Sequence, residues 1–332
     1  MIARDAAATL PACLASVAAV ADEMVVVDTG SSDDTAAVAR EHGARVIPFR
    51  WCDDFAAARN AYVRAARGSW VLSLDADEVL DPVDREGLRA VLAANPRTAC
   101  VVTVRNYFAL GELNWPYMPS EFLGEVSPGI GCMTSRTIRL FPRATLPEYR
   151  FPVHESLVPS LRHRGVAIRH CRLGIHHTGY LGGRGEFEAR AALYGRLGER
   201  KLELFPRHPL AHLELGRVRL FEGEIDDAAR LFRNCIRLRP RLVPAHFFYV
   251  LALAHGGHSG EAHGHLARAL ELMPGDPDLL YLRGLLALES AGPEAVAADL
   301  APALRRMSAG APERAQMPPR VLASASSRSD AP

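Results

Sequence analysis

Three carboxylates follow a short apolar stretch in the segment VLSLDADEVL, residues 71–80: Asp75, Asp77 and Glu78. Asp75 and Asp77 are separated by one residue, a spacing that turns both side chains to the same side of a strand. Two unpaired carboxylates about 4 Å apart repel by roughly 4 kcal/mol at an effective dielectric of 20. A divalent cation, Mn²⁺ or Mg²⁺, turns that repulsion into attraction and also binds phosphate oxygens. The pattern therefore indicates a metal site for a phosphate-bearing ligand, with a solvated acidic turn before the helix at Pro82 as the alternative.

A further acid follows another apolar stretch, MVVVDTG at residues 24–30. Ligands of open parallel sheets bind at the carboxyl ends of the strands, where Asp28 and the pair Asp75 and Asp77 are expected to lie. If the two strands are neighbours, the three acids face one crevice. The alternative for Asp28 is an Asx turn that precedes the following glycine.

The segments around these acids alternate between strand-like and helix-like patterns. Short apolar, β-branched runs are typical of buried strands, whereas capped amphipathic segments are typical of helices. The expected strands span 24–30, 44–49, 70–77, 99–108, 136–142 and 165–170, and the expected helices span 32–43, 54–68 and 82–95. Repeated strand–helix units predict an α/β domain over residues 1–185 with a mostly parallel, Rossmann-like sheet.

The chain changes character after about residue 186, where a 34-residue period begins. The positions that recur are Pro206, Pro240 and Pro274, together with Gly223 and Gly257. A helix–turn–helix unit of this length with a closing proline is typical of tetratricopeptide repeats, so we expect an all-α repeat domain over residues 186–307. A few antiparallel helices without a true repeat are the alternative. The segment 308–332 is rich in Ser, Ala and Pro, a composition that predicts a disordered tail.

Composition and charge narrow the class of protein. The chain of 332 residues has a formal net charge of +1, so nucleic acid and anionic membranes are not expected as partners. No apolar run reaches the roughly 18 residues of a membrane span, and the N-terminal MIARDAAATL has no apolar core of signal-peptide length. The six cysteines are scattered singly, which disfavours a zinc site and favours separate thiols in a reducing cytoplasm. We therefore expect a cytoplasmic protein without a membrane span.

Three of these segments resemble, in order and spacing, consecutive motifs of family-2 glycosyltransferases with a GT-A fold. They are DEMVVVDTGSSDDT at 22–35, WCDDFAAARN at 51–60 and WVLSLDADEVL at 70–80. VHES at 153–156 and HTGY at 177–180 extend the match, and the repeats are similar to those of a branch that places sugars on bacteriocin peptides. The opening MIARD resembles the first strand and nucleotide loop of the family but departs from it at residues 4–6, which leaves the contacts of that loop open. The expected first strand is either short or truncated.

The resemblance implies roles for five residues around the donor. Asp28 is similar to the acid that contacts the nucleotide base or ribose, and Arg59 and Asn60 match the ARN segment near the nucleotide-sugar. Asp77 is similar to the acid that binds the metal directly, whereas Asp75 reaches the ribose or the metal. The alternative for Asn60 is a polar contact within a helix.

The same resemblance implies a metal-binding histidine and a general base. His177 is similar to the histidine that completes metal coordination, and the sequence does not distinguish it from the adjacent His176. An inverting transfer needs one base that takes a proton from the acceptor. Glu155 is the expected base, and His154 beside it orients the acceptor or acts as the base itself. The alternatives are a His–Glu pair at the surface of a loop, and a core histidine.

These features predict an inverting, metal-dependent glycosyltransferase that uses a nucleoside-diphosphate sugar, with a UDP-sugar as the expected donor. Stacked helix pairs form concave surfaces that bind extended peptides, so the repeats are expected to hold a peptide or protein acceptor or to mediate homodimerisation. The sugar, the acceptor (a peptide, a glycan or another molecule) and the oligomeric state are left open. The alternative from another class is a scaffold whose transferase-like domain is inactive and whose repeats bind a partner.

Overall fold

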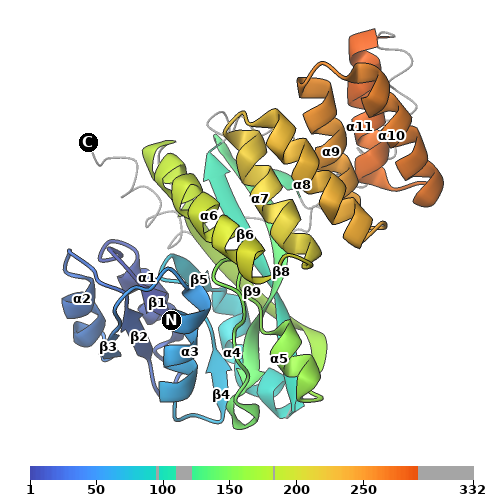
Figure 1. Ribbon diagram of the computed structural model, residues 1–332. Coiled ribbons are helices and arrows are strands. Elements are labelled where there is room, and N and C mark those ends of the chain that lie inside the picture. The colour runs from blue at the N-terminus through green and yellow to red at the C-terminus, as the bar shows by residue number, and fades with distance from the viewer. Residues whose placement is uncertain (95–96, 110–121, 182–183, 291–332) are drawn as a thin grey trace. The chain divides into compact units, whose positions relative to one another are not determined.

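The computed structural model describes residues 1–94, 97–109, 122–181 and 184–290 (Figure 1). The described chain divides into two compact units, one that ends at Phe187 and one that begins at Glu188. The first unit combines strands and helices, and the second is helical, which confirms the α/β class followed by helical repeats. The predicted tail at 308–332 lies outside the described residues.

The first sheet consists of three parallel strands in the order β1–β2–β3. The elements of this region are β1 (Ile2–Ala3), α1 (Leu10–Val17), β2 (Val25–Asp28), α2 (Thr35–Glu41), β3 (Arg45–Pro48) and α3 (Phe55–Ala65). The valines of β2 are buried in its centre, as expected for a strand with neighbours on both sides. Asp54 caps α3 by accepting a hydrogen bond from the backbone N–H of Ala57 at 2.9 Å, which fixes where the helix begins.

The second sheet has six strands, and most of its pairs are antiparallel. Its elements are β4 (Trp70–Leu72), β5 (Glu78–Leu80), β6 (Thr98–Ala109), β7 (Phe122–Ser127), β8 (Ile130–Pro142) and β9 (Ala167–Tyr180), with helices α4 (Pro82–Ala94) and α5 (Val158–His163). In the order β4–β8–β6–β9–β5, the pair β6–β9 is parallel and the other three pairs are antiparallel. The mostly parallel arrangement that the sequence predicted therefore holds for β1–β3 and is wrong for this sheet, because local pattern shows that a strand exists but not which strand lies beside it.

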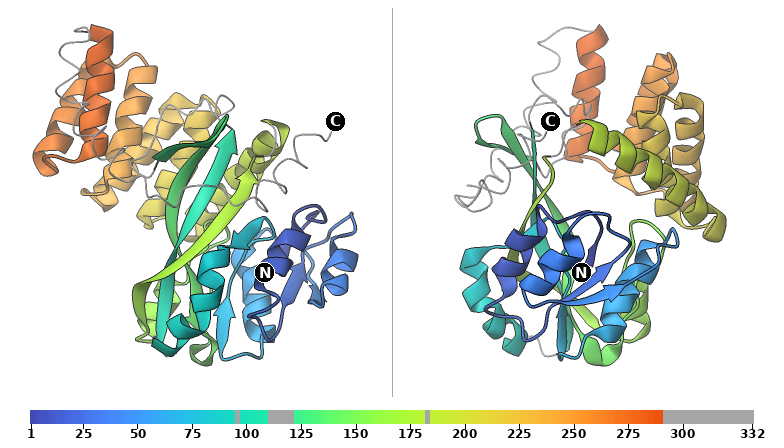
Figure 2. Two further views of the ribbon diagram at one scale, coloured as in Figure 1. Left: turned by 180° about the vertical axis from the view of Figure 1, so that it is seen from behind. Right: turned by 90° about the vertical axis from the view of Figure 1, so that its left-hand side faces the viewer.

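β4 and β5 lie at opposite edges of this sheet, although only residues 73–77 separate them. β4 pairs with β8, and β5 pairs with β9. The intervening segment carries Asp75 and Asp77, and it must pass from the β8 side of the sheet to the β9 side. The long central strands β6, β8 and β9 are coloured teal to yellow-green in Figure 2.

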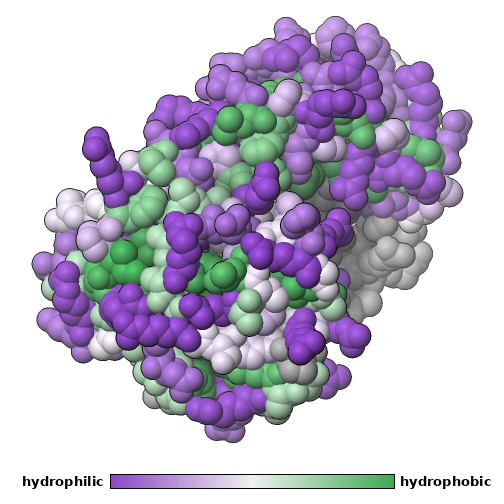
Figure 3. Space-filling view, turned by 60° about the horizontal axis from the view of Figure 1, so that its bottom comes forward, coloured by the Kyte–Doolittle hydropathy of each residue, from purple (hydrophilic) through white to green (hydrophobic). Residues whose placement is uncertain are grey.

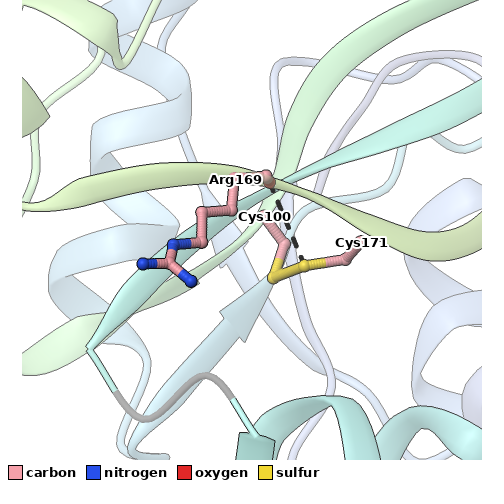
Figure 4. The surroundings of a disulfide bond; sticks show 3 residues. All are labelled: Cys100, Arg169 and Cys171. Atoms are coloured by element: carbon pink, nitrogen blue, oxygen red, sulfur yellow. Dashed lines mark hydrogen bonds between the residues drawn. A yellow bond between two sulfur atoms is a disulfide. The ribbon is translucent and has the colours of Figure 1, made fainter.

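A disulfide between Cys100 and Cys171 cross-links β6 and β9 (Figure 4). Their Cα atoms lie 5.5 Å apart, whereas 71 positions separate them in the chain. In the parallel register Cys100 lies opposite Arg169, which brings the two cysteines together on adjacent strands. The expectation of six separate thiols is therefore wrong for this pair, since cysteine spacing does not reveal which strands are neighbours.

The cross-link predicts how many thiols the denatured protein exposes. The cysteines outside this disulfide are Cys13, Cys52, Cys132 and Cys235. Titration with a thiol reagent in denaturant without reductant should therefore give four thiols per chain, and six after reduction. Cys100→Ser is the matched control, since it releases Cys171 and should give these four thiols plus one. Six thiols in the unreduced wild-type protein would contradict the disulfide.

The described part of the second unit consists of helices. They are α6 (Arg184–Leu204), α7 (Pro209–Phe221), α8 (Ile225–Leu238), α9 (Val243–His255), α10 (Ser259–Leu272) and α11 (Pro277–Ser290). Helices α7, α9 and α11 begin 34 residues apart, and so do α8 and α10. One contact recurs at the same interval: His212 Nε2 lies 2.9 Å from the Pro206 oxygen, and His246 Nε2 lies 2.6 Å from the Pro240 oxygen. The 34-residue tetratricopeptide-like period is therefore confirmed.

No helix in the four described ranges is both long and apolar enough to cross a membrane. On the face shown in Figure 3, hydrophobic residues occur in patches among hydrophilic ones. Large exposed apolar side chains, such as Val83 and Phe221, belong to different elements. Scattered apolar side chains of this kind are ordinary on protein surfaces.

Candidate active site

Asp75 lies in a buried network of charges just after β4. Its Oδ1 accepts a hydrogen bond from Arg59 Nη2 at 2.7 Å, and its Oδ2 accepts one from Arg139 Nη2 at 2.8 Å. Burial acts to raise the pKa of Asp75, but the two guanidinium groups outweigh it and hold that pKa well below its usual range. Both oxygens of Asp75 are therefore paired with cations from α3 and β8.

Arg139 also joins Asp75 to Glu78, the third acid of the segment. Arg139 Nη2 donates to Glu78 Oε1 at 2.5 Å, and Glu78 Oε2 accepts from the backbone N–H of Asp75 at 2.9 Å. The Glu78 side chain is only 2% exposed, and burial raises its pKa although Arg139 acts in the opposite direction. No motif of the sequence pointed to Arg139. Its charge within the strand-like segment RTIRLFP is the one local feature that sets it apart from its apolar neighbours. Arg139 and Glu78 therefore stabilise the turn that carries Asp75 through hydrogen bonds to its side chain and backbone.

The structure places His177 beside Asp77. His177 Nε2 lies 3.4 Å from Asp77 Oδ2, and His177 Nδ1 lies 2.8 Å from Asn106 Oδ1. An amide oxygen only accepts, so Asn106 keeps a proton on Nδ1 and turns Nε2 toward the Asp77 carboxylate. Burial acts to lower the pKa of His177, but the charge and hydrogen bond of Asp77, together with the charges of Glu78 and Asp75, raise that pKa overall. Asn106 lies opposite His177 in the β6–β9 register, and no motif of the sequence pointed to it.

The adjacent histidine, His176, points the other way, because successive side chains of a strand alternate. His176 is 1% exposed, with Nδ1 at 2.7 Å from Tyr107 Oη and Nε2 at 3.3 Å from Asp81 Oδ2. Its ring also stacks on that of Tyr107. Both nitrogens of His176 have protein partners, and His177 is the one of the two that lies beside Asp77, the second acid of the D-x-D pair Asp75 and Asp77.

Asp77 and His177 fit two ligands of one divalent cation. Ligands bound about 2.1 Å from one ion lie no more than about 4.2 Å apart, and Asp77 Oδ2 and His177 Nε2 are 3.4 Å apart. The carboxylate suits both Mg²⁺ and Mn²⁺, whereas the imidazole favours a transition metal such as Mn²⁺. Within the part of the chain that the structure describes, no three His, Cys, Asp or Glu side chains gather into a metal site. Hard cations of this kind also bind phosphate oxygens and water.

Gly179 leaves the space in which these two side chains meet. A Cβ at this position would contact Asp77 Oδ2 and would lie 2.6 Å from His177 Nε2. Any larger residue would therefore displace the carboxylate or the imidazole. The glycine of the HTGY segment is explained by this close approach.

Gly179→Ala should weaken Mn²⁺ binding by about tenfold or more, because the added methyl group separates the two candidate ligands. Gly87→Ala on α4 is the matched control, since a Cβ there meets nothing within 4 Å. Mn²⁺ affinity in the presence of UDP, measured by electron paramagnetic resonance, distinguishes the variants, and circular dichroism checks that both are folded. Equal Mn²⁺ affinities in the two variants would contradict this role of Gly179.

Glu155 projects from a loop that two backbone hydrogen bonds close, at 3.0 and 2.9 Å between Arg150 and Ser156. Its Oε1 accepts a hydrogen bond from Arg59 Nε, so one guanidinium group contacts both Glu155 and Asp75. The Glu155 side chain is 13% exposed. His154, the neighbouring candidate, adopts a left-handed backbone conformation with a φ of 47°, which is uncommon for a residue other than glycine.

Asn60 and Asp28, the remaining donor-site candidates, make internal hydrogen bonds. Asn60 Nδ2 donates to the Tyr149 carbonyl at 3.0 Å, and Asn60 Oδ1 accepts from the Tyr149 N–H at 2.8 Å. Asp28 Oδ1 accepts from the backbone N–H groups of Gly30 and Ser31 and from the Ser31 hydroxyl, which is an Asx turn. Asn60 thus holds the segment at Tyr149, and Asp28 shapes the turn after β2. Their contacts with a donor stay predictions.

The first part of the chain matches the model of a known protein family. Residues 1–146 match the model of the family described as Glycosyl transferase family 2. This range includes the D-x-D segment together with Arg59, Asn106 and Arg139. The family model thus covers the first part of the chain, and the resemblance to family 2 glycosyltransferases seen in the motifs is confirmed there.

Similar proteins include both glycosyltransferases and repeat proteins. A TPR repeat-containing protein of Synechococcus elongatus is 40% identical over 163 residues, 48% of this chain and 35% of that protein. The SPbeta prophage-derived glycosyltransferase SunS of Bacillus subtilis is 25% identical over 200 residues, 59% of this chain and 43% of that protein. A solved thermophilic TPR protein of Thermus thermophilus matches with a TM-score of 0.34 and 19% identity, over 44% of this chain and 84% of that one. This chain spans less than half the length of either curated relative. These two relatives fit a family 2 domain joined to tetratricopeptide repeats.

Proposed function

We propose that this protein is an inverting, metal-dependent glycosyltransferase that moves a sugar from a nucleoside-diphosphate sugar, with a UDP-sugar as donor, to an acceptor. The observation that carries the proposal is the Asp77–His177 pair, in which Asn106 turns the imidazole toward the carboxylate. In a family 2 domain, an acid and an oriented imidazole at the D-x-D segment suit a cation that also binds a diphosphate.

On the donor side, Asp77 and His177 would hold Mn²⁺ or Mg²⁺, and the bound ion would offset the charge that develops on the diphosphate leaving group. Asp75 acts as a positioning residue, because Arg59 and Arg139 occupy both of its oxygens. The same arginines keep the turn that presents Asp77 in place. Asp28 and Asn60 would complete the surroundings of the nucleotide, as the family resemblance implies.

On the acceptor side, Glu155 would act as the general base. Arg59 holds its Oε1, so Oε2 is the oxygen that takes the proton from the acceptor hydroxyl or thiol. As that proton leaves, the acceptor atom forms a bond to the anomeric carbon while the bond from that carbon to the diphosphate breaks on the opposite face. The sugar is therefore transferred with inversion. His154 is the alternative base, and orienting the acceptor is its other expected role.

Incubation with a panel of nucleotide-sugars and Mn²⁺ tests the proposal. Release of a nucleoside diphosphate should occur with one class of donor, stop when a chelator removes the metal, and be lost in Asp77→Ala. Release that survives both treatments would rule out a metal-dependent reaction at this site. The same panel identifies the donor base and the sugar.

The repeats support a second role, which is the binding of a partner. Stacked helix pairs present surfaces for extended peptides, so they would hold a peptide or protein acceptor or a second copy of the chain. A scaffold with an inactive transferase domain is the competing function, and the name of the Synechococcus relative refers to its repeats alone. A scaffold would bind its partner equally well after Asp77→Ala and would release no nucleotide from any donor. The cytoplasmic location stays a prediction. The thiol titration is relevant to it, because disulfides are rare in a reducing cytoplasm.

A further inference from the structure

A pocket of about 590 Å³ lies beside Glu155 in the first unit. The central strands contribute apolar side chains to it: Val101 from β6, Ile138 from β8 and Ile168 from β9. Tyr149 and the N-terminal end of α5 also line it. Concave sites of this volume with a largely apolar lining and a few polar groups are typical of small-ligand binding.

The charged residues that line the pocket are Glu155, Arg136 and Arg162. Glu155 is already paired with Arg59, which donates to its Oε1. Arg136 and Arg162 are exposed, and among the described residues neither forms an ion pair with an acid. In the described part of the chain, the pocket therefore has two guanidinium groups that no acid pairs with, together with apolar lining residues.

The donor diphosphate is not the expected occupant of this pocket. Asp77 and His177, the candidate metal ligands, do not line it, whereas the candidate base Glu155 does. In an inverting transfer the acceptor approaches on the side away from the leaving group, and the base lies on the acceptor side. The arrangement therefore matches an acceptor site.

We propose that this pocket binds the acceptor, and that the acceptor carries a carboxylate or phosphate group which Arg136 and Arg162 bind. An apolar or ring-shaped part next to the anionic group would pack on Val101 and Ile138. Guanidinium groups bind carboxylates and phosphates through paired hydrogen bonds, so an anion is the natural counterpart of the two free arginines. The inference rests on the proposed function and deepens it by naming the chemical class of the acceptor.

Three ring compounds test this assignment: benzoate, phenyl phosphate and benzyl alcohol. All three carry an aromatic ring, and only the first two are anions. We expect the better-bound anion to bind at least about tenfold more tightly than benzyl alcohol in calorimetric titrations without donor or metal. Comparing benzoate with phenyl phosphate shows whether the site prefers a carboxylate or a phosphate.

Variants locate the binding. The double variant Arg136→Gln/Arg162→Gln should lose the preference for an anion. Arg172→Gln is the matched control, because Arg172 is an exposed arginine of β9 that does not line the pocket. Equal binding of charged and neutral compounds to the wild-type protein would overturn the proposal. So would a preference for the anion that survives the double substitution.

A second readout connects the pocket with the reaction. Benzoate should slow the metal-dependent hydrolysis of the donor in the wild-type protein, because it keeps water away from Glu155. The double variant should be insensitive to benzoate at the same concentration. If hydrolysis is present but benzoate bound through the arginines does not slow it, the pocket is not the acceptor site. If no donor is hydrolysed while arginine-dependent anion binding persists, the proposed function fails, and the pocket is an anion site without an acceptor role.

Discussion

Replacing Asp77 by alanine should lower the rate of sugar transfer by about 10² to 10³-fold. Asp77 Oδ2 faces His177 Nε2 at 3.4 Å, and these atoms are the two candidate protein ligands of the cation. Without the carboxylate, the charge that develops on the leaving diphosphate loses its main counterpart, and the loss of such a stabilising group costs factors of this size. The measurement is the initial rate of nucleoside-diphosphate release with saturating Mn²⁺, together with the affinity for the donor.

Asp22→Ala is the matched control for this substitution. Asp22 is an exposed acid, and it lies outside β2 and the D-x-D segment. Removing it changes the net charge by the same amount, so we expect its rate to stay near that of the wild-type protein. Equal rates for Asp77→Ala and Asp22→Ala would show that Asp77 has no part in the reaction.

Replacing Glu155 by glutamine should lower kcat by about 10² to 10⁴-fold while the affinity for the donor changes little. Glutamine keeps an oxygen that accepts from Arg59 Nε, so the contact with the α3 arginine is retained. Its amide cannot take a proton from the acceptor. The loss should therefore appear in kcat for transfer, and the dissociation constant for UDP in the presence of Mn²⁺ should stay the same.

His154→Ala separates the two candidate bases. If Glu155 is the base, His154→Ala should affect mainly the KM for the acceptor, because His154 then only orients it. If His154→Ala abolishes kcat while Glu155→Gln changes it little, His154 is the general base and Glu155 is not. A loss of UDP binding in Glu155→Gln would instead show that this residue acts on the donor side.

Local patterns predicted several elements of the first unit, although the strand expected over 70–77 ends at Leu72, and α1 and β5 were not expected. The valine run that ends at Asp28 is β2, and the segment after Asp54 is the capped helix α3 that carries Arg59. Both signals reside in a few consecutive residues, because strand burial and helix capping are local effects. The 34-residue period predicted from the second half likewise matches the interval at which helices α7, α9 and α11 begin.

The pairing of the strands could not be predicted in the same way. β4 and β5 are separated by five residues, 73–77, yet lie at opposite edges of the second sheet. The pairings β6–β8 and β6–β9, on which that order depends, join segments that are distant in sequence. The Cys100–Cys171 disulfide and the contact between Asn106 and His177 follow from those pairings, so no local motif pointed to them.

The same limit applies to the charges around the D-x-D acids. The spacing of Asp75 and Asp77 suggested that both face one cation. The structure pairs Asp75 with Arg59 and Arg139 and leaves Asp77 beside His177. His176 and His177 lie on opposite faces of β9, because side chains alternate along a strand, and the sequence could not show which face meets Asp77.

Mn²⁺ binding in the presence of UDP tests the central claim most directly, and it requires no knowledge of the acceptor. Electron paramagnetic resonance of wild-type protein, Asp77→Ala, His177→Ala and the exposed control His163→Ala measures the affinity of each for the ion. We predict one Mn²⁺ per wild-type chain, an affinity that falls at least about tenfold in both site variants, and no change in the control. An Mn²⁺ affinity that is the same in all four proteins would contradict the claim that Asp77 and His177 hold the metal.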